Sequence, residues 1–417
     1  LARAGAGGST ASERAGPPRF GMLRPDDRGP AVRDLQAALA ALGFYERPPD
    51  AAFGPATTDA VAAFQGDHGL VVDGIAGPTT LTAMVAAVAD QAAVDAAEAE
   101  AGLGSAVQAG RLSPDAARRY RRVVADSLAG LRVLPPGRSA AVGAVLAAVA
   151  AHSDAYDEPR ALALFGMLTA NARHLAEHRL PAGRRDIVDD EGVVYRYFPA
   201  HGFQLHPLAN FARLNALVRK GDREAAREHA RALLARAVRA DGATLWEYYF
   251  PYGGPARWTS GFVQAVAAQA LARTGAWLDD ASLLEEARAA YRAVPNGLSR
   301  DLAGGSWVRE YGFSDTAILN AQLQSIVSLS EYVDLSGDQE ARALVERMSL
   351  AVQGLLARFD TGCWSRYALD GAPASTSYHT YHVTLLRSLG RRRAEPVWSE
   401  TAARWQGYLE SGACTTT

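Results

Sequence analysis

Apolar residues recur every three or four positions through most of this chain, and that spacing restricts what it can fold into. From Leu112 onward such segments follow one another with short polar connections, the pattern of α-helices that each bury one face. Since 48% of the 417 residues are hydrophobic, a sizeable core is available. The spacing predicts helices over 114–131, 138–152, 157–178, 205–219, 221–239, 258–274, 280–293, 313–333, 337–358, 379–390 and 394–410.

Helices that follow one another in this way favour a mainly α fold, a toroid of helical hairpins of the (α/α) barrel type. We expect this large domain to occupy residues 111–412. Its longer connections are rich in Trp, Tyr, Pro and Gly. Folds of this type commonly bind saccharides where the long loops gather, an expectation that rests on analogy between folds.

The N-terminal part of the chain has a different texture. Residues 1–19 are Gly-rich and aperiodic, and we expect them to be disordered. Between 20 and 88, three Gly-Pro pairs each predict a helix start. The hexapeptide 53–58 (Phe-Gly-Pro-Ala-Thr-Thr) is echoed by 75–80 (Ile-Ala-Gly-Pro-Thr-Thr). Residues 89–110, rich in Ala, Glu and Asp, predict a helical linker to the large domain.

The segment 20–88 resembles the three-helix type of peptidoglycan-binding domain. The matching positions run along its whole length: Val32, Leu35, Gln36, Leu42, Gly43, Phe53, Gly54, Thr57, Ala60, Val61, Phe64, Gln65, Gly69, Leu70, 73–77 and Thr80. One departure is Ala51, where the family usually has glycine after an aspartate. The resemblance implies attachment to cell-wall peptidoglycan or another glycan. The alternative is a module that only packs against its neighbour.

Basic residues exclude several kinds of chemistry. The net charge is −2, which gives no electrostatic case for a nucleic-acid partner. Lys220 is the only lysine, and Gly221 follows it, so the chain has no Gly-Lys-Ser/Thr phosphate loop. Schiff-base catalysis would have to rest on that one lysine, in a predicted turn. Proton transfer is therefore expected from glutamate and tyrosine, and neutralisation of charge mainly from arginine.

Cysteine content and the ends of the sequence bear on location. Cys363 and Cys414 are too few for a disulfide framework, and either pairing with each other or two separate thiols is open. No apolar run is long enough to span a membrane. Because the first residue is Leu1 rather than Met, we expect an upstream segment to have been removed or not to be included, and we expect a secreted or cell-envelope location.

Aromatic residues concentrate in the long connections of the large domain. The segments 245–252, 258–261, 306–311, 364–367 and 378–382 all carry them. Aromatic rings are costly to expose, and their faces suit the C–H bonds of sugar rings. We assign about half of them, Trp246 and Trp307 included, to the core, and take Tyr248, Tyr252 and Trp258 as candidates for binding a saccharide.

The large domain resembles the C-terminal catalytic domain of the D-glucuronyl C5-epimerases, in order and approximate spacing from about 195 to 410. Segment 201–208 (His-Gly-Phe-Gln-Leu-His-Pro-Leu) matches the family's helix start only loosely. Segment 258–264 matches a Trp-x-Ser-x-x-x-Gln block, and 307–311 matches Trp-x-x-Glu-Tyr. Phe359-Asp360-Thr361-Gly362, Tyr367 and the segment 378–382 (Tyr-His-Thr-Tyr-His) match the family's last series.

The resemblance implies an enzyme, an isomerase that inverts C5 of D-glucuronate or a similar uronate within a polysaccharide. It implies Glu310 and Tyr378 as the acid/base pair, with Tyr311 and Tyr367 as catalytic-site tyrosines that hold the substrate and assist proton transfer. It adds Gln264 as a substrate-binding residue, beside Trp258. No cofactor is implied. Such a reaction needs acid/base groups on opposite faces of C5 and donors or cations around the carboxylate, because removal of the C5 proton leaves an enediolate.

Other candidates come from proximity in sequence. Arg309 and Arg366, together with Arg257, are placed to neutralise the uronate carboxylate. His379 and His382 lie three apart at a predicted helix start, which suits substrate binding, support of Tyr378, or a metal, although no third metal ligand is evident.

Several alternatives stay open. A uronate lyase begins with the same proton abstraction. A glycoside hydrolase would pair Glu310 with Glu247 or Asp370 across the site. A non-catalytic wall-binding protein with a degenerate enzyme domain is the third. Asp370 also stands where the epimerase family tends to have an arginine, which leaves the polymer undetermined. A homodimer is possible.

Overall fold

The computed structural model describes residues 21–412. The predicted disordered segment at 1–19 and Cys414 therefore lie outside the described residues. Among the residues that are described, no helix is both long and apolar enough to cross a bilayer.

The N-terminal module contains the helices α1 (Pro30–Ala41), α2 (Pro55–Asp67) and the first turns of α3 (Pro78–Gln108). Each helix has a glycine at its N-cap and a proline in its first turn, as the Gly-Pro pairs predict. Its core is built from residues of all three helices and of the loops between them, among them Leu35, Phe53, Phe64 and Met84.

The internal repeat of this module is visible in two glutamines. The amide nitrogen of Gln36 donates to Asp50, to the Ala52 carbonyl and to Thr57. The amide nitrogen of Gln65 donates in the same way to Asp73, to the Ile75 carbonyl and to Thr80. Each glutamine is buried and ties a turn to the helix that follows it.

The segment predicted as a linker helix is a continuation of α3. Its alanines at 89, 92, 96, 99 and 106, together with Leu103, are buried in the core of the next helices. Alanines at this spacing form a stripe that lets α5 (Pro136–Ala150) and α4 (Pro114–Leu131) approach closely. Residues 89–108 therefore belong to a packed layer of helices rather than to a free connector. Their small alanine side chains are buried against the neighbouring helices.

The module also packs against the large domain. Helix α1 contacts α5, and Ala38, Val88 and Ala140 form a small cluster between them. Gly137 is part of this contact, since a Cβ there would overlap the backbone of Asp34. The module is thus docked through helix α1 on its neighbour.

The remaining helices form successive pairs. They are α6 (Glu158–Glu177), α7 (Pro207–Lys220), α8 (Arg223–Ala235), α9 (Gly261–Leu278), α10 (Ala281–Arg292), α11 (Leu319–Ser336), α12 (Gln339–Leu355), α13 (Thr376–Arg392) and α14 (Pro396–Ser411), with 3₁₀ turns at Ser153–Ala155 and Leu356–Phe359.

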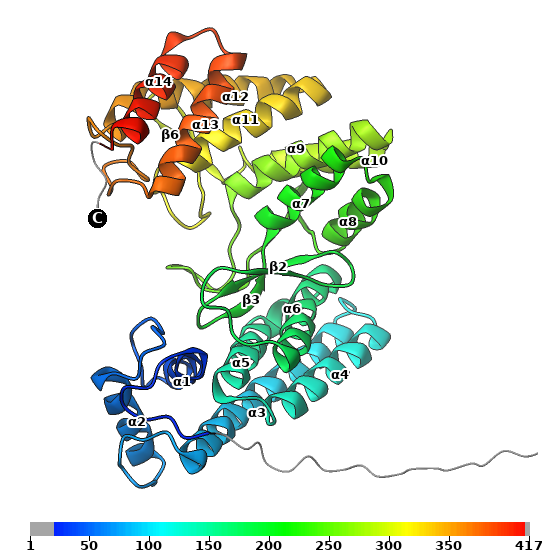
Figure 1. Cartoon of the computed structure of the whole chain (residues 1–417). Helices are drawn as coiled ribbons and strands as arrows, with labels where there is room; N and C mark the ends of the chain where they lie inside the picture. The colour runs from blue at the N-terminus through cyan, green and yellow to red at the C-terminus, as the bar shows by residue number, and fades with distance from the viewer. Residues whose placement is uncertain (1–20, 413–417) are drawn as a thin grey trace, which may run out of the picture.

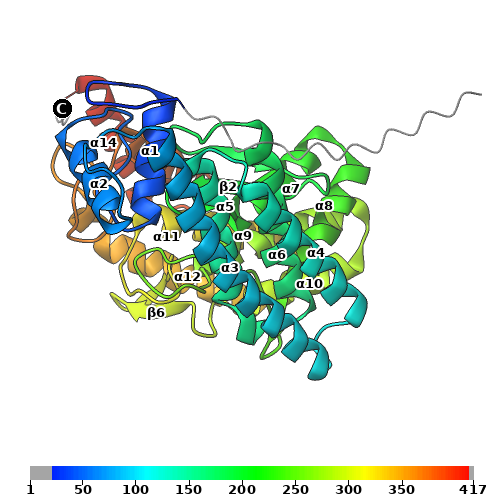
Figure 2. The ribbon, with the colours of Figure 1, turned by 90° about the horizontal axis from the view of Figure 1, so that it is seen from below.

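The helices alternate between two layers. Helices α7, α9, α11 and α13 contact one another in sequence, while α8, α10, α12 and α14 each pack against the partner that precedes them in the chain. Figure 1 shows these pairs following one another along an arc, and Figure 2 shows α3 and α4 beside α5 and α6 from below. The predicted mainly α class with (α/α) hairpins is confirmed.

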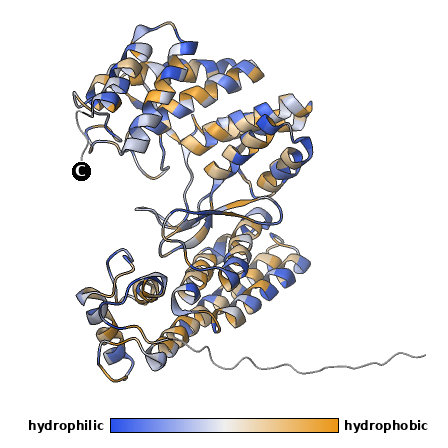
Figure 3. Cartoon of the chain, in the orientation of Figure 1, coloured by the Kyte–Doolittle hydropathy of each residue, from blue (hydrophilic) through white to orange (hydrophobic). Residues whose placement is uncertain are grey.

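The two layers differ in polarity. Helix α9 is buried along almost its whole length, whereas α8 and α10 bury only a few residues each. Figure 3 shows the same contrast, with α9 largely hydrophobic and hydrophilic residues along α8 and α10. The main core lies between the layers and includes the fully buried Trp246 and Trp307, the two tryptophans predicted to be core residues.

Short antiparallel strands connect some of the pairs. The three-stranded sheet has the order β1 (Asp186–Val188), β2 (Val194–Phe198), β3 (Gly202–Leu205). Two hairpins are formed by β4 (Val238–Ala240) with β5 (Ala243–Leu245), and by β6 (Ser299–Leu302) with β7 (Gly305–Val308). In the β6–β7 hairpin, Arg300 pairs with Trp307, and Glu310 is the second residue after the end of β7.

Candidate active site

The loop that carries Glu310 is fixed by backbone hydrogen bonds on both sides. The Arg309 amide donates to the Leu298 carbonyl over 2.9 Å, and the Arg309 carbonyl accepts from Gly261 over 2.9 Å. The Gly312 amide then donates to the Thr259 carbonyl over 2.8 Å. Glu310 is therefore held between the end of β7 and the start of α9.

Two glycines make this close approach possible. A Cβ on Gly261 would overlap the Leu298 carbonyl, and a Cβ on Gly312 would lie 2.8 Å from the Thr259 carbonyl. Ser260 caps α9 by accepting from the Val263 amide. The Trp-Thr-Ser-Gly and Trp-x-x-Glu-Tyr blocks, separate in sequence, are thus one structural unit.

The Glu310 carboxyl group is poorly solvated. Its Oε2 atom is buried and has no hydrogen-bond partner. Burial raises the pKa of Glu310 to about 7. A carboxyl group with this pKa can release or accept a proton near neutral pH, as a general acid or base requires.

Three tyrosines gather around Glu310. The side chains of Tyr311 and Tyr367 lie close enough for each to affect the pKa of the other. The rings of Tyr367 and Tyr378 meet edge to face with centroids 4.7 Å apart. The structure thus brings together all four residues predicted to be catalytic, and we call Glu310, Tyr311, Tyr367 and Tyr378 the acid/tyrosine cluster.

The electrostatics of this cluster favour neutral phenols. Burial, followed by the Glu310 carboxylate, raises the pKa of Tyr311 and of Tyr367 well above the usual value of 10. The charge beside these two tyrosines is negative, which disfavours a phenolate base at either position.

Tyr381 is a neighbour of the cluster that the sequence reasoning did not select. Its hydroxyl donates to Gln324 Oε1 over 2.7 Å, and burial followed by Glu310 and Tyr378 raises its pKa to about 12. Tyr381 lies one helical turn beyond Tyr378 on α13, so the i, i+3 spacing was the available signal.

The predicted arginines are engaged elsewhere. Arg309 forms a salt bridge with Asp315 and donates to the Gly297 carbonyl. Arg366 donates to the Gly371 carbonyl, and Arg257 lies 4.0 Å from Glu247. Proximity in sequence did not predict where these arginine side chains point, because a side chain on a loop pairs with whichever acceptor the local turn places within reach.

Some predicted substrate contacts are packing residues. Gln264 is fully buried and donates to the Thr244 carbonyl, which joins α9 to β5. Tyr248 and Trp258 are buried and stack on each other with centroids 4.1 Å apart. Tyr252, by contrast, is 50% exposed and its ring lies 5.7 Å from that of Tyr311. Of this group only Tyr252 is open to a ligand.

The two histidines predicted to bind substrate are also internal. His379 is fully buried, with one nitrogen on the Trp405 carbonyl and the other on Ser365. His382 is fully buried with Nδ1 2.8 Å from Ser365 Oγ, and burial lowers its pKa to about 3. Both point from α13 to the loop that carries Tyr367, so they position that loop rather than bind a substrate.

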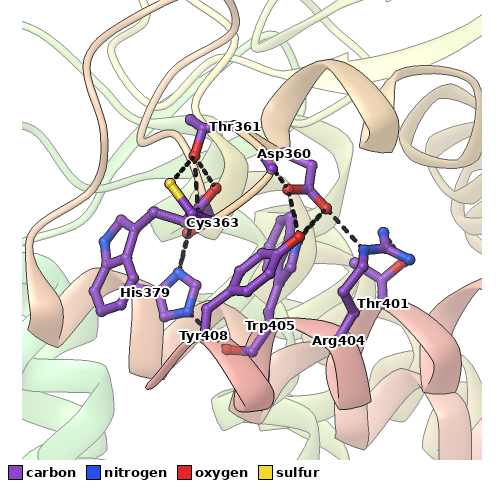
Figure 4. Close-up of polar contacts among 11 residues, drawn as sticks. Asp360, Thr361, Cys363, His379, Thr401, Arg404, Trp405 and Tyr408 are labelled. Carbon is purple, nitrogen blue, oxygen red and sulfur yellow. Dashed lines mark hydrogen bonds and ion pairs between the residues drawn. The ribbon is translucent and has the colours of Figure 1, made fainter. Parts of the chain in front are cut away.

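Asp360 anchors the other end of the same loop. Its carboxylate accepts from Arg404, Trp405 and Tyr408 of α14 and from the Gly362 amide. Figure 4 shows this network beside His379, Thr361 and Cys363. Cys363 takes part in a disulfide bond. The Phe-Asp-Thr-Gly block therefore fixes the loop from which Tyr367 projects.

The carboxylates considered for a glycoside hydrolase lie in other surroundings. Both Glu247 oxygens accept from Arg160, over 2.9 and 3.1 Å, and Tyr249 donates to one of them. Asp370 is exposed and paired with Arg358. Both are therefore neutralised by arginine, whereas Glu310 is not.

A cavity of about 760 Å³ lies away from the cluster, between α4, α6 and β1. Its lining includes Tyr120, Phe165, His174 and Arg236, and it contains none of the predicted site residues. Among the described residues, no group of three His, Cys, Asp or Glu side chains is arranged to hold a metal ion.

Comparison with protein families gives two matches. Residues 28–84 match "Putative peptidoglycan binding domain", and residues 240–407 match "D-glucuronyl C5-epimerase C-terminus". A curated D-glucuronyl C5-epimerase from Caenorhabditis elegans is 28% identical over 179 residues, 37% of this chain. The match covers 29% of that relative, so this chain spans less than a third of its length.

Solved structures give only loose similarity. An endoglucanase from Komagataeibacter sucrofermentans is 15% identical, with 49% of this chain and 71% of that one covered and a TM-score of 0.34. Endo-beta-1,4-glucanase CMCax from Acetobacter xylinum is 17% identical over 52% and 73% of the two chains, with a TM-score of 0.35. Unsaturated glucuronyl hydrolase from Bacillus sp. GL1 is 16% identical over 65% and 85%, with a TM-score of 0.29.

The family matches coincide with the two parts of the fold described above. The epimerase match contains the whole acid/tyrosine cluster, and the other match contains the paired glutamine turns. Residues 240–407 are thus similar to the C-terminal domain of the D-glucuronyl C5-epimerases, and residues 28–84 are similar to a peptidoglycan-binding domain.

Proposed function

We propose that this protein is a carbohydrate epimerase that inverts C5 of D-glucuronate, or a similar uronate, within a polysaccharide. The observation that carries the proposal is the Glu310 carboxyl group, which has a buried oxygen without a partner and lies beside three tyrosines. The match to the epimerase family over 240–407 supports the same reaction.

In this proposal Glu310 is the base. The hydrogen on C5 is weakly acidic because the uronate carboxylate is attached to that carbon. Glu310 takes it as a proton, and the two electrons of the C–H bond pass into the carboxylate to give an enediolate. A carboxyl pKa of about 7 suits this step, since the group is largely ionised just above neutral pH yet holds a proton more strongly than an ordinary glutamate.

Tyr311 and Tyr367 stabilise the enediolate as hydrogen-bond donors. Their raised pKa values keep them protonated at neutral pH, so they can donate to the developing charge. Neutral phenols thus take the role first expected of arginines. Arg309 is paired with Asp315, Arg366 donates to the Gly371 carbonyl, and Arg257 lies near Glu247.

Tyr378 completes the inversion. It returns a proton from its hydroxyl to the opposite face of C5, and the phenolate regains a proton from solvent while Glu310 releases the one it took. Tyr378 is 37% exposed, which gives it access to water for that exchange. Atoms balance, since one C5–H bond breaks and one forms.

A uronate lyase remains the nearest alternative, because it shares the first step and then expels the C4 substituent. A glycoside hydrolase is less favoured, because Glu247 and Asp370 are paired with Arg160 and Arg358. A wall-binding protein without activity would leave the buried, unpartnered Oε2 atom of Glu310 unexplained.

The N-terminal module suggests where the enzyme works. We propose that it attaches the enzyme to peptidoglycan or another envelope glycan, in line with the family match over 28–84, and that the protein acts outside the cytoplasm. A pull-down with purified cell wall, comparing the full chain with a Gln36→Ala, Gln65→Ala variant, tests attachment separately from catalysis. Equal retention of the two would contradict it. Assembly as a homodimer predicts twice the mass of one chain in solution, and the mass of a single chain would contradict it.

The reaction is tested with a glucuronate polymer of the heparosan type in deuterated water. Epimerisation predicts deuterium at C5 together with iduronate-type residues, whereas a lyase gives an unsaturated product that absorbs in the near ultraviolet. Absence of both C5 deuterium and unsaturated product in several uronate polymers would exclude both.

A further inference from the structure

Exposed aromatic rings are rare in this molecule and are gathered in one place. Among residues 21–412, the large aromatic side chains that are exposed are Tyr252 at 50%, Phe313 at 36% and Tyr378 at 37%. Tyr378 belongs to the acid/tyrosine cluster. The other two lie beside Tyr311, with ring centroids 5.7 Å (Tyr252) and 5.8 Å (Phe313) from it. Exposure of such rings is costly unless a ligand covers them.

The chain is shaped to hold Phe313 in this position. A Cβ on Gly254 would overlap the Phe313 ring, so the loop 251–257 passes over it only because residue 254 is glycine. Phe313 also meets Trp258 edge to face at 5.7 Å, and Trp258 is itself held by a hydrogen bond to the Phe250 carbonyl. Phe313 is thus exposed yet fixed, as a preformed binding surface requires.

We propose that Tyr252 and Phe313 form a stacking subsite for the sugar that neighbours the reacting uronate. This inference rests on the proposed function and adds a substrate-length requirement to it. A hexose ring presents apolar C–H bonds on its face and hydroxyl groups at its edge, which matches an aromatic surface with water around it. Because both rings contact Tyr311, a sugar stacked on them would be adjacent to a uronate held at Glu310.

Substrate length is the property that tests the subsite. The probes are a heparosan-type tetrasaccharide and free glucuronate, which lacks any neighbouring sugar, titrated against the full chain carrying Glu310→Gln, which removes catalysis from the measurement. Tryptophan fluorescence reports binding, because Trp258 lies 6.5 Å from Tyr252. The chain without further changes is expected to bind the tetrasaccharide more tightly than free glucuronate.

Tyr252→Ala and Phe313→Ala are expected to lower the tetrasaccharide-to-glucuronate affinity ratio about tenfold together, which corresponds to about 1.4 kcal/mol. Tyr252→Phe should preserve the ratio, because stacking needs the ring and not the hydroxyl. Gly254→Ala should imitate Phe313→Ala by displacing the ring. Leu350→Ala, which removes an exposed side chain from α12, is the matched control and should leave the ratio unchanged.

The outcomes separate this subsite from the reaction itself. If both alanine substitutions together leave the ratio unchanged, the subsite is wrong even when C5 exchange is observed. If the ratio falls in the alanine variants while the active chain exchanges no C5 hydrogen, the subsite stands and the proposed reaction is wrong. Equal affinity for the two probes in the Glu310→Gln chain would also overturn the subsite.

Discussion

Tyr367 and Tyr378 meet edge to face at 4.7 Å, although one projects from an irregular loop and the other from the first turn of α13. His379 and His382 tie that loop to α13 through Ser365, which sets the distance between the two rings. The contact therefore depends on buried polar groups that never reach a substrate. It places two phenols with different access to water next to one carboxyl group.

Tyr378→Phe should separate proton exchange from inversion. Without the Tyr378 hydroxyl the opposite face loses its acid, while Glu310 can still remove the C5 proton and return one from solvent to the same face. We expect inversion to fall by roughly 10²–10⁴-fold, with deuterium still entering C5 in the original configuration. Nuclear magnetic resonance of the polymer measures both. Equal loss of exchange and inversion would contradict the assignment of separate faces.

The pH dependence of kcat/KM should report Glu310. Because its pKa is raised to about 7 and its ionised form is the base, kcat/KM should rise tenfold per pH unit below 7 and level off above it. A profile that is already flat at pH 5 would mean that an ordinary, exposed carboxylate carries the reaction. Glu247→Asp is not expected to move the midpoint.

The free energy of unfolding should also depend on the ionisation of Glu310. Between about 4.5 and 7 the unfolded chain releases the Glu310 proton while the folded chain retains it, so the free energy of unfolding falls as pH rises through this window. Glu310→Gln removes this penalty and should stabilise the protein by roughly 1–3 kcal/mol at pH 8, with little gain at pH 4. Urea unfolding at both pH values checks this. A gain of equal size at pH 4 would point to packing instead.

Glu247→Gln tests the rival assignment. In the structure Glu247 balances the charge of Arg160, so the substitution should lower the free energy of unfolding by about 3 kcal/mol rather than act on the chemical step. Thermal unfolding and C5 exchange measured on the same samples distinguish these effects. A large loss of turnover at unchanged stability would restore Glu247 as a candidate for chemistry.

Ala51 in the N-terminal module offers a test of backbone strain. It has a φ of 64°, the left-handed conformation that its repeat equivalent Gly74 adopts at 69°. Ala51→Gly should stabilise the module by about 0.5–1 kcal/mol. Gly74→Ala should destabilise it by more, because the new Cβ would lie 2.7 Å from a Thr58 methyl group. Hydrogen exchange of amides in α1 and α2 measures both, and the opposite order would contradict the repeat.

The sequence predicted the helices well because each carries a long apolar stripe. Helix α4 begins and ends where the spacing placed it, and α10, α12 and α14 are within a few residues. The strands were not predicted, because segments of three to five residues are too short to display alternation. Helix α11 starts later than expected, at Leu319, because the chain first forms the turn that follows Glu310.

Part of the candidate site was predicted from matches to a family motif rather than from apolar spacing. Residue types that match a family motif identified Glu310 and the three tyrosines, which the fold brings together. The same motif also contains Gln264, His379 and His382, and nothing in the sequence separates residues that touch substrate from residues that hold the loops. Arg309 and Arg366 were assigned by adjacency, which gives no information on where a long side chain points.

The central claim is that Glu310 removes the C5 proton of a uronate, and deuterium incorporation tests it most directly. The full chain and its Glu310→Gln variant are incubated with a glucuronate polymer in deuterated water, and C5 is followed by nuclear magnetic resonance. The account predicts steady incorporation by the unmodified chain and a rate at least about 10²-fold lower for Glu310→Gln. Incorporation at the same rate by both proteins would contradict it.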